Sequence, residues 1–100
     1  MSMRDKANEM KVTAKFTITT KTNHDSLWAE ATFADNSYVR FSVTRSGIGS
    51  RGNANLTNFQ VLASKAKEVY QEWKKNRSSL TYGDLVERVS EAWVKISEDA

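Results

Sequence analysis

The sequence predicts an α+β fold: a three-stranded antiparallel meander followed by an antiparallel pair of α-helices packed on one sheet face. Apolar and polar residues alternate in three consecutive segments, which predicts strands over residues 11–20, 26–34 and 38–45. Apolar residues recur at helical spacing in two later segments, which predicts helices over residues 57–76 and 81–98. Because the connections between these segments are short, neighbouring elements should run antiparallel.

The length of the chain predicts one domain. The protein has 100 residues, with 15 Lys and Arg against 12 Asp and Glu, and a formal net charge of +3. A chain of this size buries too little surface for two separate cores, so residues 11–100 should form one domain. Residues 1–10 form an N-terminal segment that could make a short helical turn.

The composition also excludes several classes of protein. The chain has no Cys, which excludes a disulfide framework, a cysteine zinc site and a thiol nucleophile. Its 39% of hydrophobic residues is too high for a disordered chain. No apolar run approaches the ~20 residues that span a bilayer. The first six residues are not followed by the apolar region of a secretory signal, so we expect a cytoplasmic protein.

Each expected strand has one apolar face. The residues expected to point toward the core are Val12, Ala14, Phe16 and Ile18 in the first strand, Leu27, Ala29, Ala31 and Phe33 in the second, and Val39, Phe41 and Val43 in the third. Residues 20–25 are polar and predict a turn. Residues 34–37 include Asp and Asn, which tolerate the left-handed backbone of tight turns.

Residues 46–55 form the only Gly-rich segment, and we expect a mobile loop there. The segment contains a literal G-x-G-x-x-G match over residues 47–52. Dinucleotide sites use that motif between parallel strands at a helix N-terminus, whereas an antiparallel strand precedes it here. A linker is therefore the better interpretation, although Ser50, Arg51 and free backbone N–H groups could contact a phosphate non-specifically.

Both helices carry start signals. Thr57 and Gln60 match a capping box, as do Thr81 and Asp84. We expect hydrophobic staples between Leu56 and Val61, and between Leu80 and Leu85. The apolar stripes are Phe59, Leu62, Ala66, Val69, Tyr70 and Trp73 in the first helix, and Tyr82, Leu85, Val89, Ala92, Trp93 and Ile96 in the second.

The last helix has more apolar surface than one packing face needs. Val86 and Val94 lie beside its stripe and widen it. Two interpretations are open: a seam for a homodimer, or a helix that is buried on two sides.

No catalytic or metal-binding set is evident. His24 is the only histidine, and its neighbours Asn23 and Asp25 favour a polar turn over a catalytic triad. One histidine with scattered carboxylates offers no ligand cluster, so we expect no metal and no cofactor. Glu87 and Glu91, one helical turn apart, fit a solvated face. An enzyme is the least favoured class.

The outward side of the expected sheet is the most informative surface. From Asn36 to Lys67 the chain has no carboxylate, so positive charge should gather in this region. Aromatic residues among cations suit binding to proteins and to nucleic acids. The residues that we expect to contact a partner are Trp28, Tyr38, Arg40, Lys15, Lys11, Arg45 and Arg51. Alternatively, Trp28 and Tyr38 are cross-strand partners or lie beneath the N-terminal segment.

Two functional hypotheses follow. The first is a small accessory or inhibitor protein, of the size and style common in phages and mobile elements. It would occlude a surface on a macromolecular partner, with a nucleic-acid-processing machine as one suitable class. The second is direct nucleic-acid binding through the same face and the Arg45–Arg51 region, with affinity that falls steeply with salt.

Overall fold

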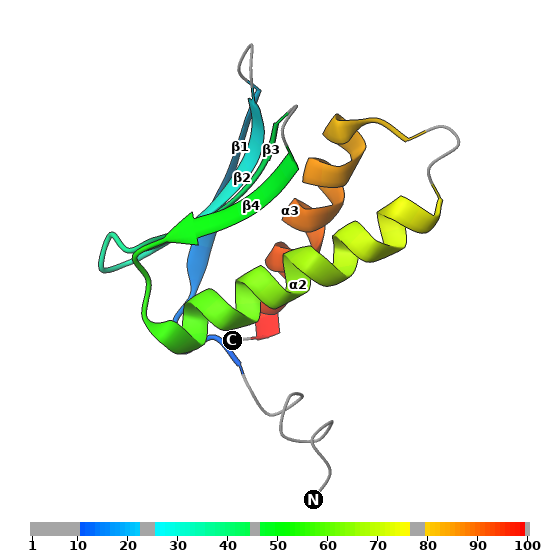
Figure 1. The fold of residues 1–100 in the computed structure, drawn as a ribbon. Helices are drawn as coiled ribbons and strands as arrows, with labels where there is room; N and C mark the ends of the chain where they lie inside the picture. The colour runs from blue at the N-terminus through cyan, green and yellow to red at the C-terminus, as the bar shows by residue number, and fades with distance from the viewer. Residues whose placement is uncertain (1–10, 23–25, 45–46, 77–79, 100) are drawn as a thin grey trace, which may run out of the picture.

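The computed structural model describes residues 11–22, 26–44, 47–76 and 80–99. Its elements are β1 (Phe16–Thr22), β2 (Ser26–Phe33), β3 (Tyr38–Thr44), β4 (Gly47–Gly52), α2 (Leu56–Lys75) and α3 (Tyr82–Asp99). The strands form one antiparallel sheet in the order β1-β2-β3-β4, and both helices lie on the same face of it (Figure 1). The α+β prediction is confirmed, with four strands in place of three.

The core forms where the apolar sheet face meets the helices. Helix α3 packs on β1, β2 and β3, while α2 packs on β3 and crosses in front of α3 (Figure 1). The inward residues expected in β2 and β3 are buried, apart from the half-buried Leu27. The largest fully buried side chains are Trp93, Phe41, Leu62, Leu85, Val39 and Val89. The predicted stripes therefore contribute to the core, with the exception of Tyr82, which is 52% exposed.

The prediction of a loop over residues 46–55 is wrong, because β4 lies within it. This strand pairs antiparallel with β3 from Thr44–Gly47 to Val39–Gly52. The sequence of β4, GIGSRG, has one apolar residue, and all six residues are exposed. It therefore lacks the apolar alternation that would predict a strand. Gly47 begins the strand with a φ of 142°, a conformation that favours glycine. A Cβ on Gly52 would lie 2.9 Å from the Cα of Val39, so a side chain there would not fit.

The prediction that the first strand begins at residue 11 is also wrong. Phe16 pairs with Phe33, the last residue of β2, so the residues before Phe16 have no strand to pair with. The Thr13 N–H and hydroxyl instead donate to Oδ1 of Asn58 in α2, at 2.7 and 3.2 Å. Val12 is buried as expected, whereas Ala14 is exposed. At its other end, β1 continues two residues beyond the expected boundary, to Thr22.

The structure confirms the predicted capping box of α3 but not that of α2. Thr81 and Asp84 form the predicted capping box, with reciprocal bonds of 2.8 and 3.2 Å between each main-chain N–H and the other's side-chain oxygen. The first helix begins earlier than predicted, and its N-cap is Asn55, whose side chain accepts from the Asn58 N–H at 2.8 Å. Leu56 is then the first helical residue and is 71% exposed, so the expected staple is absent.

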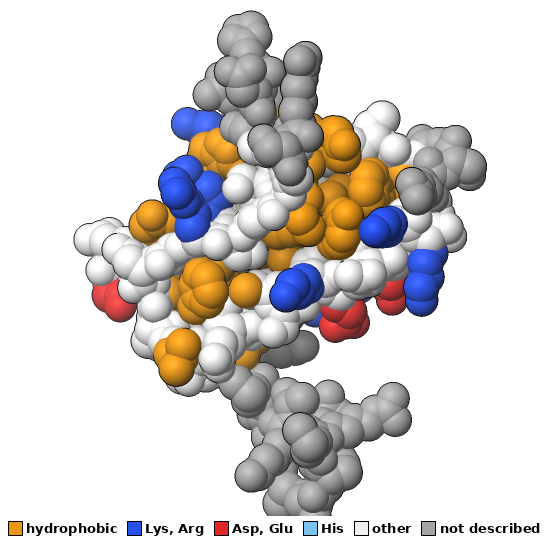
Figure 2. Space-filling view, viewed as in Figure 1, with side chains coloured by type: hydrophobic (Ala, Val, Ile, Leu, Met, Phe, Trp, Pro, Cys, Tyr) orange, Lys and Arg blue, Asp and Glu red, His pale blue; other side chains and the backbone are white. Residues whose placement is uncertain are grey.

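The wide apolar surface of α3 is partly explained by packing. Val86 is buried in the core, which supports a helix buried on two sides, while Val94 remains 43% exposed. The inward-facing Ile48 of β4 is 37% exposed, because α2 and α3 pack on β1–β3. Figure 2 shows apolar side chains at the surface between β4 and α2. In the described part of the chain, neither helix has the length and apolarity to cross a membrane.

Candidate binding face of the sheet

The sheet has a second face, opposite the helices, which we call the outward face. The pairing register places on it Thr17, Thr19, Lys21, Trp28, Glu30, Thr32, Tyr38, Arg40, Ser42, Thr44, Gly49 and Arg51. All of these residues are exposed or half-buried. Within the described ranges no helix or strand covers this face (Figure 1). It is therefore the broadest surface of the sheet that is open to a partner.

Arg40 lies at the centre of the outward face. Its guanidinium carbon is 4.4 Å from the ring centroid of Trp28 and 5.7 Å from that of Tyr38. Its Nε and Nη2 atoms both donate to Oε1 of Glu30, at 3.1 and 2.8 Å. Glu30 is directly opposite Arg40 in the register, so the ladder itself places the two charges together. One side chain thus joins two aromatics and a carboxylate.

The two aromatics are not cross-strand partners, as one interpretation of the sequence had it. Trp28 is opposite Ser42, and Tyr38 is opposite Thr32. Arg40 bridges them because it shares a strand face with Tyr38 and contacts Trp28 on the neighbouring strand. Cation–π contacts of this kind contribute about 0.5–1 kcal/mol at exposed sites. The contact therefore adds little to the stability of the fold.

The charges of the face are uneven. Arg51 lies opposite Arg40 on β4, and Glu30 compensates Arg40. Lys21 lies opposite Trp28 at the other side of the face. Neither Lys21 nor Arg51 forms an ion pair with a described residue. The centre of the face is consequently close to neutral, and its uncompensated positive charge lies at the two sides.

A hollow of about 390 Å³ lies on the sheet beside Arg51, and Ser42 and Gly49 are among its lining residues. Nothing lies within 4 Å of the position that a Cβ on Gly49 would take. Because Gly49 has no side chain, the surface is open at this position of β4. The outward face therefore has a hollow beside Arg51 as well as charged side chains.

The structure brings together four of the seven predicted contact residues: Trp28, Tyr38, Arg40 and Arg51. Lys11 and Lys15 precede β1, so the prediction that they lie on the strand's outward face is wrong. Lys15 instead lines a hollow beside Ser97 and Glu98 of α3. Arg45 lies outside the described residues, as does His24.

Lys21 and the pairing role of Glu30 were missed by reasoning from the sequence. The polar residues 20–25 predict a turn that includes Lys21, although the alternation of Thr17 and Thr19 continues to Lys21 and indicates a longer strand. The bond between Glu30 and Arg40 depends on the register of β2 against β3, which a single strand's pattern does not contain.

The described residues contain no group of three or more His, Asp or Glu side chains that could hold a metal ion. The G-x-G-x-x-G segment is an antiparallel edge strand, and α2 begins four residues after Gly52. This geometry differs from the strand-to-helix turn that binds a pyrophosphate.

Comparisons with protein-family models, with curated proteins and with solved structures find no match to this chain.

Proposed function

We propose that the chain is a small non-catalytic binding protein, an accessory or inhibitor protein that occludes a surface of a protein partner with its outward face. The observation that carries this proposal is the Arg40 guanidinium, held 4.4 Å from the Trp28 ring centroid and bound to Glu30. Trp, Tyr and Arg are the residue types most enriched at the energetic centres of protein interfaces. We place the protein in the cytoplasm, as its sequence suggests.

Preorganisation supports this function. Binding costs about 0.5–1.5 kcal/mol for each long side chain that must be immobilised. Arg40 is already held by two hydrogen bonds to Glu30 and by the neighbouring rings, so much of this cost is met in the free protein. A partner that covers Trp28, Tyr38 and Arg40 would bury aromatic surface around a charge that is already paired.

The charge distribution indicates the chemistry of the partner. Lys21 and Arg51 lie at the sides of the near-neutral centre, where the rim of an interface would form. A complementary protein surface would present an apolar centre with Asp and Glu around it. Such rim charges mainly set the rate and specificity of association.

Direct nucleic-acid binding is the second candidate, and Lys21 and Arg51 favour it because no described carboxylate pairs with them. Two features weigh against it. The carboxylate of Glu30 neutralises Arg40, and the guanidinium of Arg40 lies over the ring of Trp28 on which a base would stack.

The protein-partner proposal is tested by tagging the chain in its native cell, cross-linking, and identifying the partner by mass spectrometry. Affinity for the purified partner is then measured for Trp28→Ala and Arg40→Ala, with Glu72→Ala, at an exposed position of α2, as the control. We expect the first two to weaken binding about 30-fold and the control to leave it unchanged. Equal effects at all three positions would contradict the use of this face.

The nucleic-acid alternative is tested by titration of single- and double-stranded oligonucleotides at two salt concentrations. If Lys21 and Arg51 each contact a phosphate, the log–log slope with salt should be about −1.8 on duplex DNA. A slope of this size that disappears in Lys21→Gln/Arg51→Gln would favour the alternative. Absence of binding at low salt would remove it.

A further inference from the structure

Among the described residues β1 ends the sheet, so its outer edge is available to pair with another strand. The Phe33 N–H donates to the Ser37 carbonyl at 2.9 Å, so the main-chain groups of Phe33 point toward β3 and away from its partner Phe16. Hydrogen-bonded and non-hydrogen-bonded pairs alternate along antiparallel strands. The N–H and C=O groups of Phe16, Ile18 and Thr20 therefore point away from β2.

A second contact supports this orientation. The Ser97 hydroxyl of α3 donates to the Phe16 carbonyl oxygen at 3.0 Å, which places this carbonyl on the side of β1 that is remote from β2. Within the described residues, no loop or helix occupies the corresponding groups of Ile18 and Thr20. These two residues present the hydrogen-bonding groups that an added strand requires.

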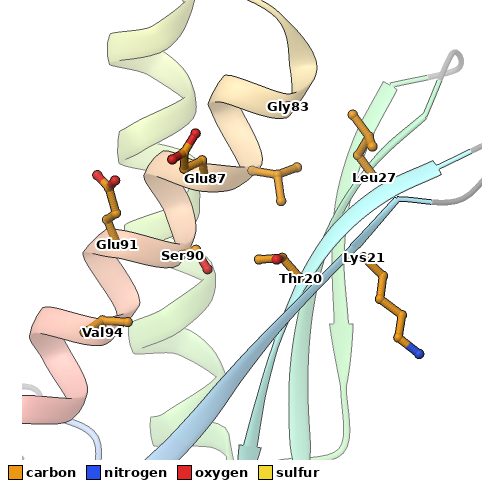
Figure 3. Close-up of a pocket in the computed structure, with 9 residues that line it drawn as sticks. Thr20, Lys21, Leu27, Gly83, Glu87, Ser90, Glu91 and Val94 are labelled. Carbon is orange, nitrogen blue, oxygen red and sulfur yellow. The ribbon is translucent and has the colours of Figure 1, made fainter.

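An open groove of about 610 Å³ runs beside this edge, between β1 and α3 (Figure 3). Thr20 points into the groove toward α3, while Lys21 points away from it (Figure 3). The helix wall includes Val86, Ser90 and Val94. Val94 is 43% exposed here, so the groove has an apolar surface that the described part of the chain leaves uncovered.

The groove continues along the same two elements. A smaller hollow of about 180 Å³ is lined by Phe16 and Ile18 from the β1 side and by Val94 from α3. Val94 is common to both hollows, so apolar surface follows the free edge of β1 past Ile18 and Thr20. An extended chain laid along the edge would have its alternate side chains over this surface.

The rim of the larger groove is acidic. Glu87 and Glu91 line it, one helical turn apart, and neither forms an ion pair with a described residue. Lys21 is the one cation among the lining residues, and its side chain points away. In the smaller hollow, the positive charge of Lys15 offsets the negative charge of Glu98. The uncompensated charge of the groove is therefore negative.

We propose that the β1 edge and this groove bind an extended segment of a partner protein in which β-branched apolar residues and Lys or Arg occupy alternate inward positions. The main chain of the segment would bond to Ile18 and Thr20, an apolar side chain would pack on Val94, and a basic side chain would reach Glu87 and Glu91. Successive inward side chains of a strand are about 6.8 Å apart, and helix residues four positions apart are ~6 Å apart along the axis. Because these spacings are similar, successive inward side chains of the segment would face successive turns of α3. This proposal does not depend on the outward face.

The test uses the full-length chain and a synthetic seven-residue acetylated peptide that alternates threonine with valine, arginine and valine. Binding is followed by fluorescence anisotropy and by amide resonances of the isotope-labelled protein. We expect the Ile18 and Thr20 amides to shift and to exchange more slowly with solvent when the peptide binds. A peptide with glutamate in place of arginine should bind at least about tenfold more weakly. The same peptide with N-methylated amides along one edge should not bind.

Charge reversal supplies the matched variants. Glu87→Arg/Glu91→Arg should weaken binding of the arginine peptide about tenfold, because two attractions become repulsions. Glu68→Arg/Glu72→Arg makes the same change at the same spacing, at two exposed positions of α2, and should leave binding unchanged. Arg40→Ala on the outward face should also have no effect, which separates this proposal from the proposed function.

Four results would overturn the proposal. The first is no binding of the peptide at millimolar concentration. The second is binding that shifts neither the Ile18 nor the Thr20 amide resonance. The third is an equal loss of affinity in Glu87→Arg/Glu91→Arg and in Glu68→Arg/Glu72→Arg. The fourth is a dimer of the protein alone, seen by sedimentation, that Glu87→Arg/Glu91→Arg converts to monomer. In that case a second copy occupies the groove, in line with the homodimer that the last helix suggests.

Discussion

The indole N–H of Trp93 donates a 3.0 Å hydrogen bond to the carbonyl oxygen of Leu62, in the buried contact between α3 and α2. Both residues are fully buried. The other tryptophan that the helices bury, Trp73, lies between the rings of Tyr70 and Tyr82, with centroid distances of 6.0 and 5.9 Å. Its indole N–H has no hydrogen-bond partner among the described residues. Both tryptophans are thus buried, but only the indole N–H of Trp93 has a hydrogen-bond partner among the described residues.

This difference predicts unequal effects of the same substitution. Trp93→Phe removes a buried hydrogen bond as well as ring volume, whereas Trp73→Phe removes ring volume together with an unsatisfied donor. We expect Trp93→Phe to lower the free energy of unfolding by about 1–2 kcal/mol more than Trp73→Phe does. Urea denaturation of both variants measures the difference. Equal losses would show that the bond between the helices contributes nothing net.

A second pair of substitutions tests β4. Gly52→Ala would place a Cβ against the Tyr38 carbonyl and 2.9 Å from the Val39 Cα, while nothing lies within 4 Å of a Cβ on Gly49. We expect Gly52→Ala to lower the free energy of unfolding by about 1–3 kcal/mol. Gly49→Ala should leave it unchanged or raise it by about 0.4–1 kcal/mol, because the unfolded chain loses freedom. The reverse order in urea melts would show that β4 does not pair with β3 as described.

A third prediction concerns the connection between the segment before β1 and α2. Asn58 is 3% exposed, and its Oδ1 atom accepts from both the N–H and the hydroxyl of Thr13. Asn58→Ala leaves these donors without their acceptor and should cost about 1–2 kcal/mol of unfolding free energy. The Thr13 amide should also exchange faster with solvent, as measured by NMR.

The control for that experiment is Asn76→Ala at the end of α2. The Asn76 side chain is exposed and donates a 3.3 Å hydrogen bond to the Glu72 carbonyl oxygen. We expect this variant to leave the Thr13 exchange rate unchanged. An equal acceleration in both variants would indicate general loosening of the helix and not a local connection.

A fourth prediction concerns pH. Hydrogen bonds from the Ser37 hydroxyl and main-chain N–H hold the pKa of Asp35 below the ordinary value of 3.8. Because the folded-state pKa is the lower one, this interaction stabilises the fold above the ordinary pKa and is lost as the pH falls through the folded-state pKa. Carbon-13 NMR titration of Asp35 should give a midpoint below 3.8.

Substitution of the donor tests the cause of this shift. Ser37→Ala removes the hydroxyl, the largest contributor, so the Asp35 midpoint should rise toward 3.8. Ser50→Ala on β4 provides the control, with an unchanged Asp35 titration. If Ser37→Ala leaves the midpoint in place, the hydroxyl bond is not its cause.

Much of the fold is predictable because local patterns match the final packing. The alternation in β2 and β3 identified the inward residues, of which Ala29, Phe41 and Val43 are buried. The same holds for the helix stripes, whose members Leu62 and Trp93 are fully buried. In these segments one face is apolar, so the pattern leaves few alternatives.

The start of the first helix shows where local signals compete. Asn55 and Thr57 are both acceptable N-caps by residue type. Asn55 is the N-cap in the structure, and Asn58 three residues later accepts from Thr13, 45 positions earlier in the chain. A capping motif spans only about four residues, so it cannot predict a contact between residues 45 positions apart.

The sequence by itself determined the α+β class, the inward faces of β2 and β3, the two helices and the aromatic and cationic residues available for binding. The tertiary structure decided that residues 47–52 form a strand, because backbone pairing with β3 does not require an apolar pattern. The tertiary structure also decided which of the predicted contact residues lie next to one another. Arg40 lies between Trp28 and Tyr38 and bonds to Glu30 only because β2 and β3 pair in one register. A shift by one residue would turn these side chains toward the core.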